Sequence, residues 1–189
     1  MTERPLDLSV LRPQRPLTTE RLRLVQHGPA HLDEAWEALQ DPEGLRQTGT
    51  HARFTREQVL AFLTRLPDAA DRADWAVLRA DDGAYLGEVV LNDLDPENRS
   101  MGFRIALANP QARGQGYGTE ATRAVVAFGL DVVGLHRIEL EVHAANPRAR
   151  RVYDKAGFVL EGTRRDALRW DGVYEDVHTM AVLATDPRP

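Results

Sequence analysis

The stretch Arg113-Gly114-Gln115-Gly116-Tyr117-Gly118-Thr119 decides the fold of this chain because of the patterns on either side of it. It follows an alternating run at 101–107, typical of a strand, and precedes apolar positions at helical spacing from about 118 to 133. Glycines let the backbone turn sharply and approach a ligand closely. A helix start leaves amide groups unpaired at the positive end of the helix dipole, an arrangement that binds pyrophosphate. We therefore expect a phosphate ligand here, with Arg113 as an added positive charge.

Other phosphate-binding turns fit the glycine spacing less well. A P-loop requires Gly-Lys-Ser or Gly-Lys-Thr, which this stretch lacks. A dinucleotide-binding fold requires G-x-G-x-x-G within repeated βαβ units, whereas these glycines lie at 114, 116 and 118 after a run of antiparallel strands. Two alternatives stay open: a nucleotide-binding oxidoreductase, with Glu139 near the position of an acidic ribose ligand, and a tight turn that binds nothing.

Downstream of this stretch the pattern returns to strands around one helix. Gly134 is the expected C-cap of the helix over 118–133. Residues 138–143 alternate strictly and predict a strand, and Pro147 suits the first position of a helix that ends at Ala156-Gly157. The last two predicted strands, 158–170 and 173–182, are joined by Asp171-Gly172.

Upstream, the sequence predicts two helices between strands. The elements expected are a strand around Leu22 and Leu24, helices over 31–40 and 55–66, and strands at 75–78 and 85–91. Asp41-Pro42 is expected to end the first helix, while Thr55 and Gln58 have the spacing of a capping box for the second. Asp82-Gly83 predicts a hairpin turn, and Asn109-Pro110 should stop the strand over 101–107. Together these elements predict one α/β domain with a mixed sheet.

Composition excludes several classes of protein. The 189 residues are 42% hydrophobic and 28% charged, which suits one globular domain rather than a fibrous or disordered chain. A net charge of −5 argues against a nucleic-acid partner. The absence of cysteine excludes disulfides and thiolate catalysis. No apolar run reaches the roughly 18 residues of a membrane span, and the N-terminus has no apolar signal-peptide core. We expect a cytoplasmic protein without a membrane partner.

Several segments resemble one known family. Arg113-x-x-Gly116-x-Gly118 matches the Q/R-x-x-G-x-G/A motif of the GCN5-related N-acetyltransferase (GNAT) superfamily, and residues 146–158 resemble its N-x-x-S/A-x-x-x-Y-x-x-x-G-F segment. Residues 19–24, and Glu161-Gly162 followed by Asp171 to Asp176, are similar to the RimJ/RimL-like branch of ribosomal-protein N-terminal acetyltransferases. The resemblance covers about 17–184, which leaves 1–16 as an N-terminal arm and 185–189 as a C-terminal tail.

The resemblance implies a single-domain α/β fold with a mixed, mostly antiparallel central sheet flanked by helices. The family's fourth and fifth strands, here residues 103–108 and 138–143, splay apart into a V-shaped gap. The co-substrate acetyl-CoA places its pyrophosphate on the glycine turn and its pantetheine along the splayed strand, like an added strand. No metal is expected. The residues expected to bind acetyl-CoA are Ile105, Ala106, Leu107, Arg113, Gly114, Gln115, Gly116, Tyr117, Gly118, Thr119, Asn146, Arg148 and Arg151.

Acetyl transfer needs an acid for the departing thiolate and a base for the attacking amine. In the family a tyrosine at the position of Tyr153 commonly serves as the acid, and a phenol, whose ordinary pKa is about 10, stays protonated at neutral pH. The alternative is that Tyr153 only packs in the core. Ala149 stands where the ribosomal branch often has serine, so no serine acid is available. Glu88 and Glu141 are the first candidates for the general base; Glu139, His143 and Asp176 also lie on predicted strands.

The sequence thus predicts an acetyl-CoA-dependent N-acetyltransferase that acts on a primary amine by direct attack in a ternary complex. The acceptor is a protein or peptide N-terminus or a small-molecule amine, bound against the two helices over 31–40 and 55–66. Leu168 stands where some ribosomal-type members have a carboxylate, which argues against a ribosomal-protein acceptor. The alternative is a non-catalytic acyl-CoA-binding module. The resemblance also allows a homodimer.

Overall fold

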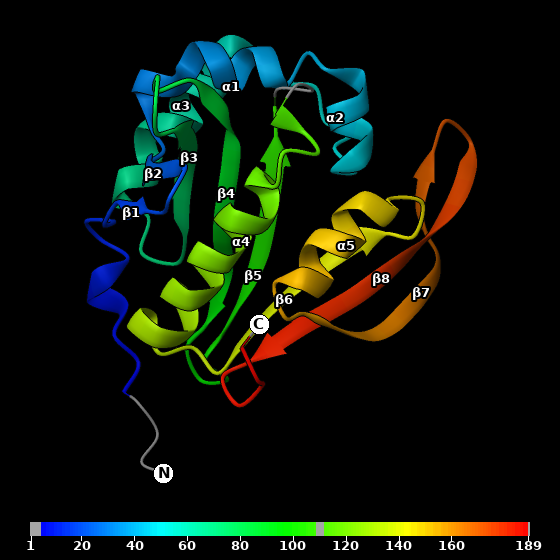
Figure 1. Cartoon of the computed structure of the whole chain (residues 1–189). Helices are drawn as coiled ribbons and strands as arrows, with labels where there is room; N and C mark the ends of the chain where they lie inside the picture. Colours follow the sequence, from blue (N-terminus) through cyan, green and yellow to red (C-terminus); the bar gives the residue numbers. More distant parts are fainter. Residues whose placement is uncertain (1–4, 109–111, 189) are drawn as a thin grey trace.

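One eight-stranded sheet runs through the molecule in the order β1-β2-β3-β4-β5-β6-β8-β7 (Figure 1). The structure is a computed structural model that describes residues 5–108 and 112–188, so the expected strand stop at Asn109-Pro110 lies outside the described residues. β5 and β6 are parallel, and the other neighbouring pairs are antiparallel. The strands are β1 Leu17–Thr18, β2 Leu22–Gln26, β3 Ala73–Arg79, β4 Tyr85–Asp95, β5 Ser100–Leu107, β6 Arg137–His143, β7 Val159–Trp170 and β8 Val173–Leu183.

Helices flank this sheet. α4 and α5 lie along one face of it, and α1 and α3 pack together around Val59, Leu63 and Leu66 (Figure 1). The α-helices are α1 Leu32–Ala38, α2 Pro42–Gln47, α3 Arg56–Arg65, α4 Tyr117–Ala127 and α5 Pro147–Lys155. Shorter helical segments are η1 Leu8–Val10, η2 Pro29–His31, η3 Leu66–Asp68 and η5 Phe128–Val133, the last with π-type geometry. This is the mixed, mostly antiparallel α/β fold that the sequence predicted.

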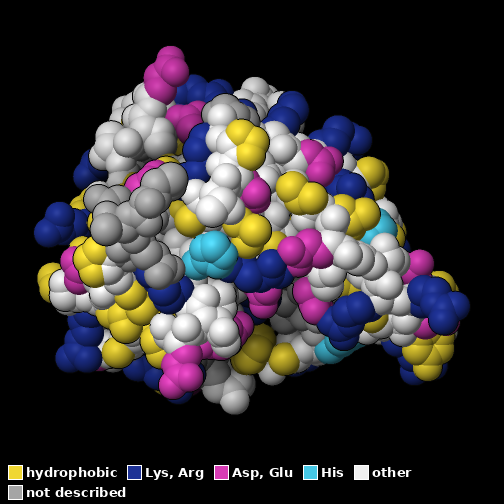
Figure 2. Space-filling view, turned by 90° about the horizontal axis from the view of Figure 1, so that it is seen from below, with side chains coloured by type: hydrophobic (Ala, Val, Ile, Leu, Met, Phe, Trp, Pro, Cys, Tyr) yellow, Lys and Arg dark blue, Asp and Glu magenta, His cyan; other side chains and the backbone are white. Residues whose placement is uncertain are grey.

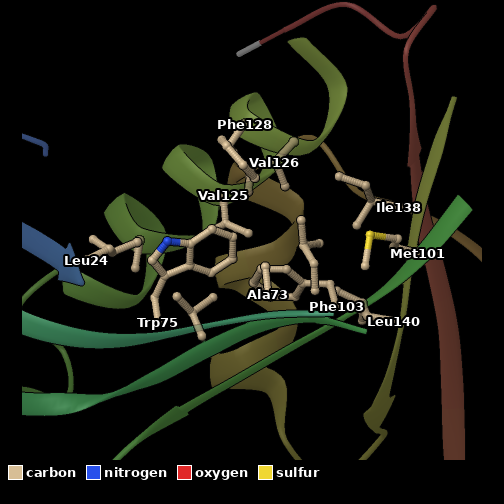
Figure 3. Packing of buried hydrophobic residues seen from close by; sticks show 14 of the residues in the cluster. Leu24, Ala73, Trp75, Met101, Phe103, Val125, Val126, Phe128, Ile138 and Leu140 are labelled. Atoms are coloured by element: carbon tan, nitrogen blue, oxygen red, sulfur yellow. The ribbon is translucent and has the colours of Figure 1, made fainter. Parts of the chain in front are cut away.

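The main core fixes α4 against the sheet. Alternate residues of the strands point toward the helix, and Figure 3 shows Leu24 and Trp75 on the strand side facing Val125 and Phe128. Trp75 is fully buried and meets the Phe128 ring edge-on, with 5.4 Å between ring centroids. Buried rings of this size contribute much of a core's stability. Because α4 is held this firmly, the glycine turn at its start is held as well.

β5 and β6 diverge after a short paired region. Their register pairs Ser100 with Arg137, Met101 with Ile138 and Gly102 with Glu139. Beyond Gly102 the described residues of the two strands no longer pair, although β5 continues to Leu107 and β6 to His143. On its other edge β5 stays paired with β4 as far as Leu107. The predicted V-shaped gap is therefore present, and one edge of β5 is free for a ligand.

Local signals placed most elements correctly. The hydrogen bonds of the Thr55–Gln58 capping box are both present, and Pro147 is the first residue of α5. The helix predicted over 118–133 continues from α4 into η5 and ends at Gly134. One prediction was incomplete: Asp41-Pro42 does more than end a helix, because Asp41 caps the unpredicted helix α2 by accepting a hydrogen bond from the Glu43 amide.

The described part of the N-terminal segment packs onto the domain. Val10 and Leu11 are buried in the main core. The Gln14 side chain exchanges two hydrogen bonds with the backbone of Asp74, at 2.9 and 3.1 Å. Residues 5–16 therefore form a cap over β3.

The surface carries mixed charges. On the face seen in Figure 2, dark blue and magenta side chains are intermingled, with hydrophobic side chains scattered between them. That face therefore offers no broad region of a single charge. None of the described helices has the length and apolar character that crossing a membrane requires.

Candidate active site

The glycine turn has the geometry of an anion-binding helix start. Gly116 is the residue before α4 and adopts a left-handed conformation, with φ of 86°. Its lack of a side chain leaves the first amide groups of α4 without a side-chain cap. A Cβ at Gly114 would meet no atom within 4 Å, so the turn faces open space there. Backbone amides at the positive end of an eleven-residue helix, next to open space, suit a pyrophosphate group.

Arg21 reaches this turn from the start of β2, and sequence reasoning did not identify it. Its guanidinium donates to the Gln115 carbonyl at 2.9 Å and ion-pairs with Glu120 at 2.6 Å. It also lies over the Tyr117 ring, 4.8 Å from the centroid. A Cβ at Gly116 would lie 3.2 Å from its Nη2. Arg21 therefore supports the turn and adds positive charge beside it, across 94 residues of sequence.

Arg113 follows β5 in sequence, and its side chain reaches back to the last residue of that strand. Its Nη2 is 3.1 Å from Asp41 Oδ2 and donates to the Leu107 carbonyl at 3.2 Å. The guanidinium thus joins the cap of α2 to the open end of the gap. Ile105, Ala106 and Leu107, the expected pantetheine-binding residues, are half-buried along this free edge of β5.

The start of α5 borders the other side of the gap. Asn146 is the N-cap, and its Oδ1 accepts a hydrogen bond from the Ala149 amide at 3.0 Å. This contact shows a capping role for Asn146. Arg148 and Arg151 are exposed on the same helix, and neither forms an ion pair with a described residue. Both guanidinium groups remain available for phosphate.

A cavity of about 230 Å³ opens between α2 and the start of α5. Its lining includes His143, Asn146, Arg148 and Glu175. The Arg46 guanidinium of α2 ion-pairs with Glu175 of β8 at 2.9 Å, and burial lowers the pKa of His143 below its ordinary value. Because His143 ends β6, this cavity lies at the wide end of the gap between β5 and β6.

Tyr153 of α5 is placed beside the gap. It is 7% exposed, and its ring meets Phe103 of β5 edge-on, with 6.2 Å between centroids. Phe103 is the first residue of β5 after the paired region, so the phenol lies where the strands begin to separate. Burial raises the pKa of Tyr153 to about 12, partly offset by Arg104. The phenol therefore keeps its proton at neutral pH and can donate it.

Glu88 of β4 lies on the opposite face of the sheet. It is the cross-strand partner of Ala106, and its neighbour Val89 points into the core, so Glu88 points to the side of α1 and α3. The side chain of Glu88 is 42% exposed. Its pKa is raised, first by loss of hydration and then by Asp74, although Arg104 and Arg72 lower it. A carboxylate with a raised pKa at the end of the gap is suited to accept a proton.

A β-bulge aims Glu88. Val77 pairs with Gly87 and Leu78 with Tyr85, so β4 carries one extra residue at this point. Gly87 has φ of 149°, and a Cβ on it would lie 2.0 Å from the Ala106 carbonyl oxygen. Only glycine allows this close approach of β4 to β5. Bulges commonly redirect side chains beside active sites.

The structure separates Glu141 from this arrangement. Glu141 is 56% exposed on β6 and ion-pairs with Arg164 of β7. Glu139 is likewise exposed and ion-pairs with Arg137. Asp176 accepts a hydrogen bond from the Asp166 amide within the β7–β8 hairpin. In contrast to Glu139 and Glu141, Glu88 pairs with no arginine among the described residues. Among the described residues there is no cluster of three or more histidine or acidic side chains placed to hold a metal ion.

Comparisons with known proteins agree with this geometry. The sequence profile of the acetyltransferase (GNAT) domain matches residues 21–159. A Bacillus subtilis protein named as an N-acetyltransferase, YjcK, is 30% identical over 69% of this chain and 72% of its own length. Another from that species, YdaF, named as a ribosomal N-acetyltransferase, is 31% identical over 54% of this chain and 55% of its own length.

A spermidine N(1)-acetyltransferase of Vibrio cholerae is 32% identical over 52% of this chain and 56% of its own length. The crystal structure of spermidine N-acetyltransferase from Vibrio cholerae in complex with CoA and spermine superposes with a TM-score of 0.82. That likeness covers 89% of this chain and 98% of the other at 21% identity, so it shows the shared fold. With its profile match, glycine turn and splayed strands, the chain belongs to the GNAT family and is an N-acetyltransferase.

Proposed function

We propose that this enzyme transfers the acetyl group of acetyl-CoA to a primary amine by direct attack in a ternary complex. The observation that carries the proposal is the gap between β5 and β6, with a protonated phenol on one face of the sheet and a carboxylate on the other. A thioester lying in this gap is accessible from both faces. The proposal places the sulfur on the side of Tyr153 and the amine on the side of Glu88.

The residues present fit acetyl-CoA. The uncapped amides after Gly116 and the positive charge of Arg21 suit the pyrophosphate, and Arg148 and Arg151 suit further phosphate. The free edge of β5 from Phe103 to Leu107 offers backbone groups to the amides of pantetheine. We place Gly114, Gln115, Gly116, Tyr117, Gly118 and Thr119 at the pyrophosphate and Ile105, Ala106 and Leu107 along the pantetheine.

The proposed reaction balances with two side chains. Glu88 accepts a proton from the acceptor ammonium, and the neutral nitrogen attacks the thioester carbonyl carbon. As the C–N bond forms and the C–S bond breaks, the phenol of Tyr153 gives its proton to the sulfur, and the attacking nitrogen releases its second proton to solvent to leave the neutral amide. Proton exchange with solvent then restores both side chains. Each proton-transfer group is expected to contribute on the order of 100-fold to the rate.

The acceptor belongs to the class of primary amines, either a peptide N-terminus or a small-molecule amine. The relatives include proteins named for a polyamine and for a ribosomal acceptor. Residues 1–94 contain sixteen acidic and eleven basic side chains, which favours a cationic acceptor on the side of α1 and α3. The motif at residues 19–24 supports placing the chain in the RimJ/RimL-like branch.

We also propose a homodimer through the β7–β8 hairpin. Val159, Val173 and Tyr174 are each about 60% exposed on this projecting hairpin. The proposal predicts a dimer by light scattering and a monomer after Val173→Asp. A monomeric parent protein contradicts it.

The enzyme proposal is tested by mixing the protein with acetyl-CoA and a panel of amines that contains N-terminal peptides, spermidine and aminoglycosides. Free thiol is followed, and the acetylated amine is identified by mass spectrometry. Thiol release that depends on one class of amine supports the proposal. Binding of CoA without thiol release from any amine favours the alternative, a non-catalytic acyl-CoA-binding module. A melting temperature raised by NAD but not by CoA supports a nucleotide-binding oxidoreductase instead.

A further inference from the structure

His27, the residue after β2, is buried without a hydrogen-bond partner. Its side chain is 1% exposed, and within the described residues neither Nδ1 nor Nε2 makes a hydrogen bond. Its backbone amide donates to the Asp74 carbonyl at 2.8 Å. An unsatisfied buried imidazole is costly in free energy, so such groups are rare and require an explanation.

The surroundings of this ring point to one partner. Nδ1 of His27 lies 3.6 Å from Oε2 of Glu88, just beyond hydrogen-bond distance. The remaining space is occupied by two rings: His31, with 5.4 Å between centroids, and Tyr85, at 6.1 Å. Among the described carboxylates, Glu88 is the one within 4 Å of the His27 nitrogens. A shift of a few tenths of an ångström brings the two atoms into contact, and catalytic hydrogen bonds often tighten in this way when substrate binds.

We propose that His27 is the positioning residue of the general base: its Nδ1–H donates a hydrogen bond to Glu88, which holds the carboxylate ionised and directed at the acceptor nitrogen. The inference rests on the proposed function, because it requires Glu88 to be the base. His27 touches neither substrate, and its effect is transmitted entirely through Glu88.

The protonation states fit this role. Burial, with a smaller effect of His31, lowers the pKa of His27 to about 4, so the ring is neutral at neutral pH. A neutral imidazole with its hydrogen on Nδ1 is a donor toward Glu88 and adds no charge to the site. A hydrogen bond to the charged form of a carboxylate lowers its pKa. His27 therefore counteracts the loss of hydration that raises the pKa of Glu88.

The other charged groups around Glu88 come from neighbouring strands. Asp74 of β3 raises the pKa of Glu88, whereas Arg104 of β5 and Arg72, the residue before β3, lower it. Tyr85 of β4 has a pKa raised well above its ordinary value by burial and is therefore neutral. From α1, Glu34 acts on Tyr85 and His31. Replacing His27 leaves these charges in place, so a changed pH profile reports the loss of the hydrogen bond.

The experiment compares kcat/KM against pH for His27→Phe, His27→Asn and the parent enzyme, using the amine found in the thiol-release assay. Phenylalanine fills the space but cannot donate, whereas the asparagine amide places a donor near the position of Nδ1. We expect His27→Phe to lower kcat/KM about tenfold at pH 7, since this is a part of what general base catalysis supplies. In the pH profile of this variant, the fall of kcat/KM on the acidic side should occur about one pH unit higher than in the parent enzyme. His27→Asn should restore the parent profile.

His31→Phe is the matched control, because it replaces a ring of the same cluster whose nitrogens lie more than 4 Å from Glu88. It should leave the acidic limb unchanged. If His27→Phe does not fold, His27→Leu and His27→Asn are compared instead, since both lose the ring and only asparagine donates.

The same substitution in an enzyme that already carries Glu88→Gln separates the positioning role of His27 from the role of Glu88 as the base. In Glu88→Gln enzyme, His27→Phe should cause no further loss, because the group it acts on is gone. An equal loss in both backgrounds, or an unshifted acidic limb, overturns the positioning role and leaves Glu88 as the base. An active Glu88→Gln enzyme with an unchanged profile instead overturns the base assignment itself.

Discussion

The guanidinium of Arg21 donates a 2.9 Å hydrogen bond to the carbonyl of Gln115, which ties the start of β2 to the glycine turn. The same side chain is held by Glu120 of α4, through a 2.8 Å hydrogen bond from Nε. The turn is therefore fixed from outside its own segment. Such support keeps backbone amides in place before a ligand arrives, which lowers the ordering cost of binding.

Replacing Arg21 should weaken acetyl-CoA binding. Arg21→Ala removes both the hydrogen bond to Gln115 and a positive charge beside the turn, so we expect KM for acetyl-CoA to rise about fivefold to tenfold, with kcat little changed. Arg23→Ala is the matched control. Arg23 is exposed on β2, and its side chain makes no hydrogen bond or ion pair with another described residue. Initial-rate kinetics against acetyl-CoA concentration measure both. Equal KM values in the two variants contradict the role of Arg21.

Tyr153→Phe should separate chemistry from binding. The ring keeps its contacts with Phe103 and Phe158, so folding and CoA affinity should be preserved. Loss of the phenolic proton should lower kcat about 100-fold. Thiol release measures kcat, and calorimetry with CoA measures the affinity. Tyr174→Phe, at an exposed position of the β7–β8 hairpin, is the control. If Tyr153→Phe is as fast as the parent, Tyr153 is only a core aromatic.

Glu88→Gln and Glu141→Gln test the choice of base. We expect Glu88→Gln to lower kcat about 100-fold and Glu141→Gln, which loses only an exposed ion pair with Arg164, to change it less than twofold. Because loss of hydration raises the pKa of Glu88, activity in the parent enzyme should fall with decreasing pH earlier than an ordinary glutamate predicts. The pH profile of kcat/KM measures this limb. A reversed ranking of the two variants makes Glu141 the base.

Gly87→Ala should destabilise the protein through the bulge that directs Glu88. A Cβ at Gly87 would overlap the Ala106 carbonyl, so β4 and β5 must move apart. We expect a loss of about 2–4 kcal/mol in the free energy of unfolding. Gly83→Ala is the control, because Gly83 also has a positive φ but faces open space, and it should cost only about 1 kcal/mol. Urea denaturation compares them, and equal losses contradict the steric argument.

Local signals were sufficient for most of the fold. The Thr55–Gln58 capping box and the Asp82-Gly83 turn each act within four residues, so the sequence pattern contains the whole interaction. Helix α2 was missed because its six residues bury only Leu45 and give no periodic pattern. The order of strands and the point where β5 leaves β6 depend on pairings between distant segments, and the family motif, not the periodicity, indicated the gap.

The same difference between local patterns and distant contacts decides which parts of the candidate site the sequence could indicate. Residues of the glycine turn and of α5 belong to contiguous motifs, and the structure brings both to the gap. Arg21 and His27 act through contacts with residues 94 and 61 positions away, Gln115 and Glu88, which no spacing rule describes. Alternation along β6 correctly put Glu139, Glu141 and His143 on one face, but only the structure shows that Arg137 and Arg164 already pair with the two carboxylates.

The buried imidazole of His27 should make the stability of the protein depend on pH. The unfolded chain binds a proton at His27 near pH 6.5, whereas the folded protein does so only near pH 4. Between these values the unfolded state holds more protons, so the contribution of His27 to stability is lost as the pH falls, up to about 3 kcal/mol by pH 4. Asp74 and Glu88, whose pKa values are raised, act in the opposite direction over the acidic range.

The difference between parent and His27→Phe isolates this contribution, since the two carboxylates remain in both proteins. Free energies of unfolding from urea titrations at pH 7, 6, 5 and 4 should show the parent losing stability relative to the variant at each step below pH 6.5. A difference that does not change with pH means that the ring protonates as readily in the folded protein as in the unfolded one. That outcome contradicts a neutral donor beside Glu88, because a ring that gains its proton at pH 6.5 has its charged form stabilised in the folded protein, either by solvent or by an ion pair with Glu88.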